Sequence, residues 1–353
     1  MNRRERMVEA IRHKEADRVP KGEICIEAGI ANRLLGREYS SEYQDYERDR
    51  AVRDLLRADF INVGDWPQEY LGKDEAGRDV YRSIYGYEFA TAGASKHMVR
   101  PPINDIQDAA QYKAPDISRV SGALVKRFRE TTDLFVFGQI GGPVSMVNEM
   151  FDMTDYMIYS MTNTAEIGLI GERVMEFEIA KAKLFLDSGA DAILIADDIA
   201  FNSGTLLPPR IMDEIVFPLH RAAVQEIKKY KDVPVFFHSD GDLRSVMDTI
   251  AGNGFDGLHS LQPSAGMDIA ELKRDYGDVL CLVGNIDLDQ VMTFSPPEEV
   301  AEVVKRTIDI AAPGGGYVLA TCNTLIDAIP DENALAMYET GQEYGVYKGR
   351  QGK

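Results

Sequence analysis

Residues 233–261 read VPVFFHSDGDLRSVMDTIAGNGFDGLHSL. They contain two short apolar runs, Val233–His238 and Gly257–Leu261, and between them a polar turn followed by a stretch of helical character. Runs this short and this apolar are typical of parallel strands that are buried on both faces. The stretch is therefore one strand–helix–strand unit, and the fold depends on how often this unit recurs.

The same unit recurs along the chain. Together with the two runs above, the predicted strands number eight, the others being Glu23–Glu27, Phe60–Val63, Leu134–Ile140, Ala192–Ala196, Val279–Val283 and Tyr317–Thr321. Amphipathic segments with helix start and stop signals lie between strands or follow the last one: Glu166–Ser188, Arg210–Tyr230, Glu298–Ala312 and Asp331–Tyr344, the last with Asp331 as its expected N-cap. This alternation predicts an α/β fold, a (β/α)8 TIM barrel, rather than an open sheet.

One region interrupts the alternation. Residues 66–115 are rich in Gly, Tyr and charged residues, and the pieces Asp79–Ile84 and Tyr87–Thr91 have the pattern of strands. We interpret the region as a β-rich insertion after the second strand, folded as hairpins over one mouth of the barrel. Residues 1–353 are then expected to form a single barrel domain.

The composition excludes several classes of partner. The chain has 353 residues, with 58 acidic and 39 basic side chains and a formal net charge of −19. Duplex nucleic acid and anionic membranes repel such a polyanion. The N-terminus lacks the apolar core of a signal peptide, and three distant cysteines form no disulfide framework. We expect a cytoplasmic protein with neither a nucleic-acid nor a membrane partner, and the sequence leaves a homodimer open.

Polar residues follow the predicted strands repeatedly. In a (β/α)8 barrel, the chemistry takes place at the C-terminal ends of the strands, where the loops converge. The residues at those positions are Glu27, Asp65, Gln139, Asp197, Asp198, His238, Asp240, His259, Asn285, Asp287, Cys322 and Asn323. The pattern predicts a functional site at this mouth.

The sharpest motif is His238-Ser239-Asp240. Residues two apart on a strand point to the same side, so His238 and Asp240 could share one target. Imidazole and carboxylate suit Zn²⁺, and a thiolate from Cys322 would complete three protein ligands and leave one position open, as in catalytic sites. On spacing alone, a structural interpretation is favoured, with His238 as a hydrogen-bonded core residue and Asp240 as the cap of a helix from Leu243 onward.

Asp197 and Asp198 form the second candidate. Neighbouring residues on a strand face opposite sides, so one of the two should enter the mouth, as an acid or base, a substrate clamp or a further metal ligand. The alternative is helix capping or an ion pair. For His259 a structural role is favoured, and Cys25 and Cys281, inside strands, are expected to pack in the core.

Several segments together resemble the uroporphyrinogen decarboxylase superfamily. They are residues 3–11 (RRERMVEAI), 16–20 (ADRVP), 238–242 (HSDGD), 282–287 (LVGNID), 312–317 (APGGGY) and 330–333 (PDEN). The resemblance covers essentially the whole chain. It implies a (β/α)8 barrel, in agreement with the strand pattern.

The decarboxylase branch of this superfamily is cofactor-free and holds substrate carboxylates with arginines in an early motif. In the corresponding residues 25–30 (CIEAGI) both arginines are missing, and Glu27 would repel a polycarboxylate. Asp65 resembles the pyrrole-binding aspartate of that branch. The late decarboxylase histidine is replaced by Cys322.

The other branch contains zinc-dependent methyltransferases that act with corrinoid proteins, such as methylcobalamin:coenzyme M methyltransferases and those of O-demethylation. These carry His-X-Cys and a late Cys, and this chain keeps His238 and Cys322 but has Asp240 at the middle position. The resemblance implies Zn²⁺ held by His238, Asp240 and Cys322. Asp197 or Asp198 would then act at the leaving group. Glu27 and Asp65 would be further catalytic residues. The lining of the pocket would include His259, Asn285 and Gln139.

The implied reaction is methyl transfer between a small methylated substrate, such as a methoxyarene or a thiol, and a corrinoid carried by a partner protein. A separate partner is expected because the chain lacks a cobalamin-binding signature of the Asp-x-His-x-x-Gly type. The alternatives are a cofactor-free decarboxylase, with Arg18, Arg33 and Arg37 as the nearest arginines, a non-catalytic partner of corrinoid proteins, and an unrelated metal-dependent hydrolase.

Overall fold

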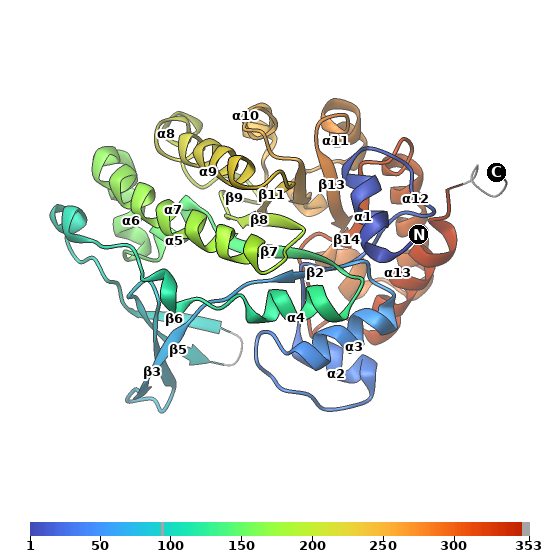
Figure 1. Ribbon diagram of the computed structural model, residues 1–353, viewed down its shortest axis with the longest axis horizontal. Helices are drawn as coiled ribbons and strands as arrows, with labels where there is room; N and C mark the ends of the chain where they lie inside the picture. The colour runs from blue at the N-terminus through green and yellow to red at the C-terminus, as the bar shows by residue number, and fades with distance from the viewer. Residues whose placement is uncertain (93–94, 348–353) are drawn as a thin grey trace.

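Seven parallel strands of the computed structural model, which describes residues 1–92 and 95–347, lie side by side in chain order and curl into a barrel (Figure 1). They are β2 (Phe60–Val63), β7 (Phe135–Gly141), β8 (Ala192–Ala196), β11 (Val235–Ser239), β12 (Gly257–Ser260), β13 (Cys281–Ile286) and β14 (Tyr317–Thr321). Each overlaps one predicted strand. The predicted barrel fold is confirmed.

The first predicted strand is wrong in its position. Instead of Glu23–Glu27, the backbone of residues 20–22 closes the barrel: Leu319 N donates to Pro20 O (2.9 Å) and Asp59 N donates to Lys21 O (2.6 Å). The following strand β1 (Cys25–Ile26) pairs with β15 (Thr324–Leu325), outside the main sheet.

The buried guanidinium of Arg53 explains why the first strand is so short. Its Nε donates to the carbonyl of Phe60 (3.2 Å) and its Nη2 to that of Glu23 (3.4 Å). The side chain thereby satisfies two carbonyls that a longer pairing of these strands would have used. A buried arginine in the helix α3 (Tyr46–Leu56) gives no local signal of this in the sequence.

The end of the barrel opposite to the predicted site is filled with side chains. Phe60 and Phe137 meet edge to face with ring centroids 5.5 Å apart, and Phe137 meets Phe236 at 5.1 Å. Met7 and Ala10 of the N-terminal helix α1 (Arg3–Ile11) pack against this interior cluster. A packed interior leaves the C-terminal ends of the strands as the place for a site.

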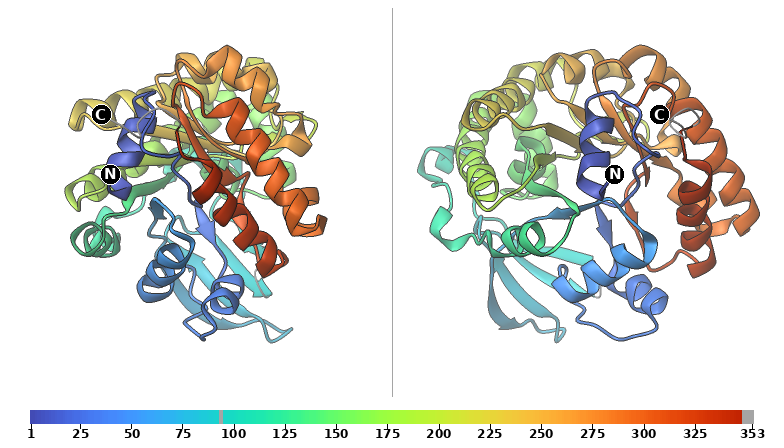
Figure 2. Two further views of the ribbon diagram at one scale, coloured as in Figure 1. Left: turned by 90° about the vertical axis from the view of Figure 1, so that its right-hand side faces the viewer. Right: turned by 45° about the vertical axis from the view of Figure 1, so that its right-hand side comes forward.

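Helices surround the strands (Figure 2). They are α2 (Ala28–Leu35), α3 (Tyr46–Leu56), α4 (Ala123–Thr131), α5 (Pro143–Asn148), α6 (Met153–Thr162), α7 (Thr164–Asp187), α8 (Pro209–Ile215), α9 (Phe217–Tyr230), α10 (Met247–Gly252), α11 (Ile269–Tyr276), α12 (Pro297–Ala311) and α13 (Asp331–Tyr344). The helix predicted over residues 210–230 is divided at Val216, because Pro218 has no N–H for a continuous helix and instead lies in the first turn of α9.

The capping role predicted for Asp331 is wrong. Pro330 is the N-cap of α13, and Asp331 is the first helical residue. The Asp331 carboxylate pairs instead with Arg33 at 2.9 Å. This ion pair connects α13 with α2.

The predicted insertion is a four-stranded antiparallel sheet. It consists of β3 (Gln68–Lys73), β4 (Asp79–Ser83), β5 (Glu88–Ala92) and β6 (Ser95–Arg100), paired in that order, with the short 3₁₀ turns at Ile106–Gln111 and Ile117–Arg119 after it. In Figure 1 the sheet projects from the barrel. The buried Tyr85 hydroxyl donates to Glu178 of α7 and so ties this region to the outer helices.

Within the described ranges, none of the helices combines the length and the apolar character that crossing a membrane requires.

Candidate functional site

Two histidines lie at the same level of the barrel. His238 of β11 is paired in register with Ala196 of β8 on one side and with His259 of β12 on the other. Phe236, two residues before His238, packs in the barrel interior. Because strand side chains alternate, His238 also points inward, one layer closer to the C-terminal mouth.

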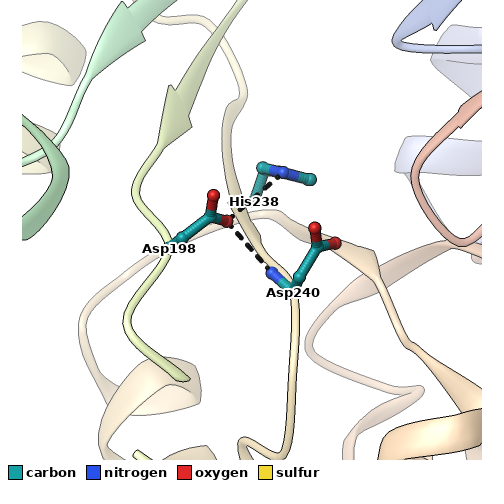
Figure 3. Close-up of side chains that lie close together, drawn as sticks. All are labelled: Asp198, His238 and Asp240. Carbon is teal, nitrogen blue, oxygen red and sulfur yellow. Dashed lines mark hydrogen bonds and ion pairs between the residues drawn. The ribbon is translucent and has the colours of Figure 1, made fainter. Parts of the chain in front are cut away.

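The side chains of two aspartates converge beside His238 (Figure 3). Asp198, His238 and Asp240 each offer one ligand atom, and these atoms all lie within 4.8 Å of one another. The Nε2 atom of His238 lies 3.6 Å from Oδ1 of Asp198, and the backbone N of Asp240 donates to the same oxygen at 3.2 Å. One nitrogen and two carboxylate oxygens are a donor set that suits Zn²⁺ or a harder divalent cation.

The loops around this group are held by specific contacts. The backbone N of Asp198 donates to Ser145 Oγ (2.9 Å), which fixes the end of β8. Gly241 has φ +89°, and a Cβ atom there would lie 2.7 Å from the backbone of Ala200 and Phe201. Glycine in the HSDGD segment therefore allows the chain after Asp240 to pass close to the β9 strand (Ala200–Phe201).

The carboxyl group of Asp240 is electrostatically the most unusual of the three. Burial raises its pKa, and the charge of Asp198 raises it further, against the opposing effects of His238 and of hydrogen bonds that include one from Asn323. Asn323 Nδ2 donates to Oδ2, while Oδ1 is buried without a hydrogen-bond partner. A bound cation would satisfy this oxygen and offset the repulsion between the two carboxylates, so the residues fit a metal ion.

Cys322 lies next to this group but is not part of it. Its thiol is buried, and burial raises its pKa to about 12, although the backbone of Leu288 acts in the opposite direction. The charges of Asp287 and Asp240 also act on the thiol. Of the three predicted metal ligands, the structure therefore brings two together, His238 and Asp240. The third member of the group is Asp198 instead of Cys322.

His259 is fully buried behind His238. The two Nδ1 atoms are 2.6 Å apart, and the rings are stacked with centroids 4.9 Å apart and an angle of 27° between their planes. Burial lowers the pKa of His259 well below its usual value. His259 is therefore neutral and contacts the site through His238.

Asp197 has a structural role and not the catalytic role that the sequence suggested for one of the two aspartates. Its buried carboxylate accepts hydrogen bonds from Val144 N (3.3 Å) and Ser145 N (2.6 Å) at the start of α5. Its Oδ2 also lies 2.8 Å from Nε2 of buried His220. Of the two neighbouring aspartates, Asp198 is the one that reaches the mouth, as strand alternation requires.

The remaining predicted site residues are not gathered around His238. Glu27 accepts a hydrogen bond from Asp327 N (2.5 Å), and Gln139 accepts one from Asn62. Asn285 has φ +81° and donates to the carbonyls of Leu261 (2.5 Å) and Met267 (3.1 Å). Asn285 therefore holds the loop after β12.

Asp65 lines a cavity of about 740 Å³ between the insertion and the barrel. Its Oδ2 accepts a hydrogen bond from Ser121 N at 2.6 Å. Sequence reasoning missed the other residues of this cavity, among them Trp66, Tyr87, Phe89, Lys96, Met146 and Glu149. They come from elements far apart in the chain, so no local pattern in the sequence marks them as one surface.

Comparisons with known proteins identify the family of this chain. Residues 85–344 match the family model described as Uroporphyrinogen decarboxylase (URO-D). The methylcobamide:CoM methyltransferase MtaA of Methanosarcina barkeri is 27% identical over 212 residues, which is 60% of this chain and 59% of the relative. A uroporphyrinogen decarboxylase of Dechloromonas aromatica is 30% identical over 166 residues, 46% of this chain and 44% of that protein. The chain thus spans less than two thirds of the length of these curated relatives.

Among solved structures, a methyltransferase from Methanosarcina mazei superimposes with a TM-score of 0.77 at 19% identity, over 98% of this chain and 99% of that one. This likeness shows that the two share a fold. Methylcobamide:CoM methyltransferases are among the relatives of this chain. The resemblance inferred from the sequence is confirmed, since the chain belongs to the uroporphyrinogen decarboxylase (URO-D) family.

Proposed function

We propose that this chain is a metal-dependent methyltransferase that acts with a separate corrinoid protein. The observation that carries the proposal is the convergence of Asp198, His238 and Asp240 at the barrel mouth. Two of its relatives, MtaA and MtbA, are methylcobamide:CoM methyltransferases, which supports the same inference. The second substrate is a small methyl donor or acceptor, such as a methoxyarene as donor or a thiol as acceptor.

The metal that we propose is Zn²⁺. His238 and Asp240 would hold it, and Asp198 and Cys322 are the two candidates for the third protein donor. When bound, Zn²⁺ supplies Lewis acidity that stabilises negative charge on the heteroatom of the methyl donor or acceptor. A carboxylate in place of a thiolate makes the metal a harder acid, which favours an ether oxygen.

The side chains of this chain have three tasks in the proposal. Asn323 orients the Asp240 carboxylate by its hydrogen bond to Oδ2. Asp198, whose side chain is 60% exposed, is accessible to a substrate heteroatom and to solvent, so it can take up a proton from solvent and pass it to the heteroatom. The aromatic cavity that Asp65 lines would take the organic part of the substrate.

The experiment is a methyl-transfer assay with free methylcobalamin and a panel of thiols, and with reduced cobalamin and a panel of methoxyarenes. Transfer is followed by the change in cobalamin absorbance. We expect transfer by the zinc-loaded protein, and loss of transfer both after chelation and in Asp240→Ala. Equal transfer with and without metal would contradict the proposal.

A cofactor-free decarboxylase is the alternative, since a uroporphyrinogen decarboxylase is also among the relatives. The arginines nearest in sequence are engaged elsewhere: Arg18 donates to Gln342 O (3.3 Å), Arg33 pairs with Asp331, and Arg37 lies over the ring of Tyr39. We therefore expect no turnover of uroporphyrinogen by the metal-free protein. Robust decarboxylation in that assay would favour the alternative.

A further inference from the structure

The cavity between the insertion and the barrel is lined by aromatic rings and by carboxyl groups. We propose that it binds a small organic cation whose charged group is an N-methylated ammonium. This inference rests on the function proposed above, because it states that the small methyl donor or acceptor carries a positive charge. The heteroatom that exchanges the methyl group is then a different atom of the same substrate.

Aromatic rings contribute much of the lining, among them those of Trp66, Tyr87 and Phe89. Tyr87 and Phe89 are buried, and their ring centroids lie 5.7 Å apart with 44° between the planes. The face of an aromatic ring carries partial negative charge, which attracts a cation and repels an anion. N-methyl groups add apolar surface that packs against such rings, and this combination is how proteins commonly recognise quaternary ammonium ions.

Ammonium groups of the chain itself already lie over two of these rings. Nζ of Lys96 lies 4.8 Å from the ring centroid of Phe89, and Nζ of Lys181 lies 3.6 Å from the ring of Trp66. Lys181 is fully buried and its Nζ is 2.9 Å from Glu178, so this pair adds no net charge that would repel a cation. Lys96 is exposed and lines the cavity, so a ligand ammonium can replace its Nζ over Phe89.

The charges of the lining favour a cation as well. Among the described residues that line the cavity, Asp65 and Glu149 are acidic and Lys96 alone is basic. Burial raises the pKa of Glu149, although Tyr87 and the charge of Lys96 act in the opposite direction. A bound cation would compensate the Glu149 carboxylate for its lost solvation, whereas a bound anion would add to the repulsion.

Helix α5 connects this cavity with the candidate metal site. Met146 of α5 lines the cavity, and the preceding residue, Ser145, accepts the hydrogen bond from the backbone N of Asp198 at 2.9 Å. The same short helix therefore borders the cavity and fixes the position of Asp198. This arrangement is what a single substrate in contact with both places requires.

The test compares choline with its uncharged carbon isostere, in which a tert-butyl group replaces the trimethylammonium group. Trp66 is the single tryptophan of the chain and lines the cavity, so its fluorescence reports binding there. The titrations use the metal-free protein, which keeps the metal site out of the measurement. We expect choline to bind about 10-fold more tightly than the isostere, which corresponds to a desolvated cation–π contact.

Three variants separate the roles of the charges. Glu149→Gln should weaken choline binding about 5-fold, the effect of one unit charge a few ångströms away in water, and leave binding of the isostere unchanged. Lys96→Gln should strengthen choline binding, because it removes the competing ammonium over Phe89. Glu75→Gln is the matched control, since Glu75 is exposed in the turn between β3 and β4 and does not line the cavity.

The comparison of the two ligands in the wild type decides the proposal even if Glu149→Gln does not fold. Equal binding of choline and its isostere, or no binding of choline, would overturn it. Equal choline binding by Glu149→Gln and Glu75→Gln would also overturn it. A protein that prefers choline but transfers no methyl group with or without zinc would keep this assignment of the cavity and lose the proposed function.

Discussion

At the scale of single residues, the two neighbouring aspartates that follow β8 have different roles, one in the packing of the fold and one at the candidate site. Asp197 is buried and bonded to His220 and to the start of α5, whereas Asp198 points into the mouth beside His238. The alternation of side chains predicted that one of the two would face each way. It could not predict which one, because that depends on the register of β8 against its neighbours.

Asp197→Ala should destabilise the fold strongly and Asp198→Ala hardly at all. The first removes one partner of a buried pair, which typically costs about 3–5 kcal/mol. The second changes an exposed side chain, with an expected effect within about 0.5 kcal/mol. Urea unfolding of the two variants measures the difference, and similar losses in both would contradict the structural assignment of Asp197.

Gly241→Ala should destabilise the protein by more than about 1 kcal/mol, because φ is +89° and the new Cβ would meet the backbone of Ala200 and Phe201. The matched control is Gly252→Ala. A Cβ atom at Gly252 would meet no other atom within 4 Å, so alanine should be neutral or stabilising there. Thermal unfolding compares the two, and a harmless Gly241→Ala would show that the tight passage is not required.

At the scale of elements, the strands were predictable and their exact pairing was not. Phe60–Val63, Ala192–Ala196 and Tyr317–Thr321 have the bounds that their apolar runs predicted. The first strand differs, because the carbonyls of Glu23 and Phe60 are bonded by the side chain of Arg53. A partner that comes from another element leaves no local trace in the sequence.

Glu23, beside this closing segment, should make stability depend on pH. Burial raises its pKa from 4.5 to about 8, although Thr321 and Tyr338 donate hydrogen bonds to it. Between these pH values the folded chain retains a proton that the unfolded chain has lost, so this group lowers stability as pH rises. The effect should be several kcal/mol at most.

Glu23→Gln removes this titration. The free energy of unfolding of Glu23→Gln, relative to wild type, should therefore increase from pH 5 to pH 8, as measured by urea unfolding at each pH. Glu332→Gln, an exposed position on α13, serves as the control and should show no such trend. A constant difference between Glu23→Gln and wild type would mean that Glu23 is already ionised at pH 5.

At the scale of the whole molecule, the barrel explains why three of the predicted site residues lie together. Once the strands are assigned, their C-terminal ends must meet, and His238, Asp240 and Asp198 do so. The fold pattern could not predict the aromatic cavity beside Asp65, because its walls come from the insertion, the start of α4, α5 and the segment before α3. The net charge of −19 and the engaged arginines argue in the same direction, against a polycarboxylate substrate.

Metal content of the purified protein tests the central claim most directly. Elemental analysis should compare wild type with His238→Ala, Asp240→Ala, Asp198→Ala and Cys322→Ala. We predict about one zinc ion per chain in the wild type, as a single site of this type would hold. His238→Ala and Asp240→Ala should both lose this zinc. Of Asp198→Ala and Cys322→Ala, the variant that removes the third protein donor should lose it as well. A wild type without zinc, or full retention of zinc in His238→Ala, would contradict the account.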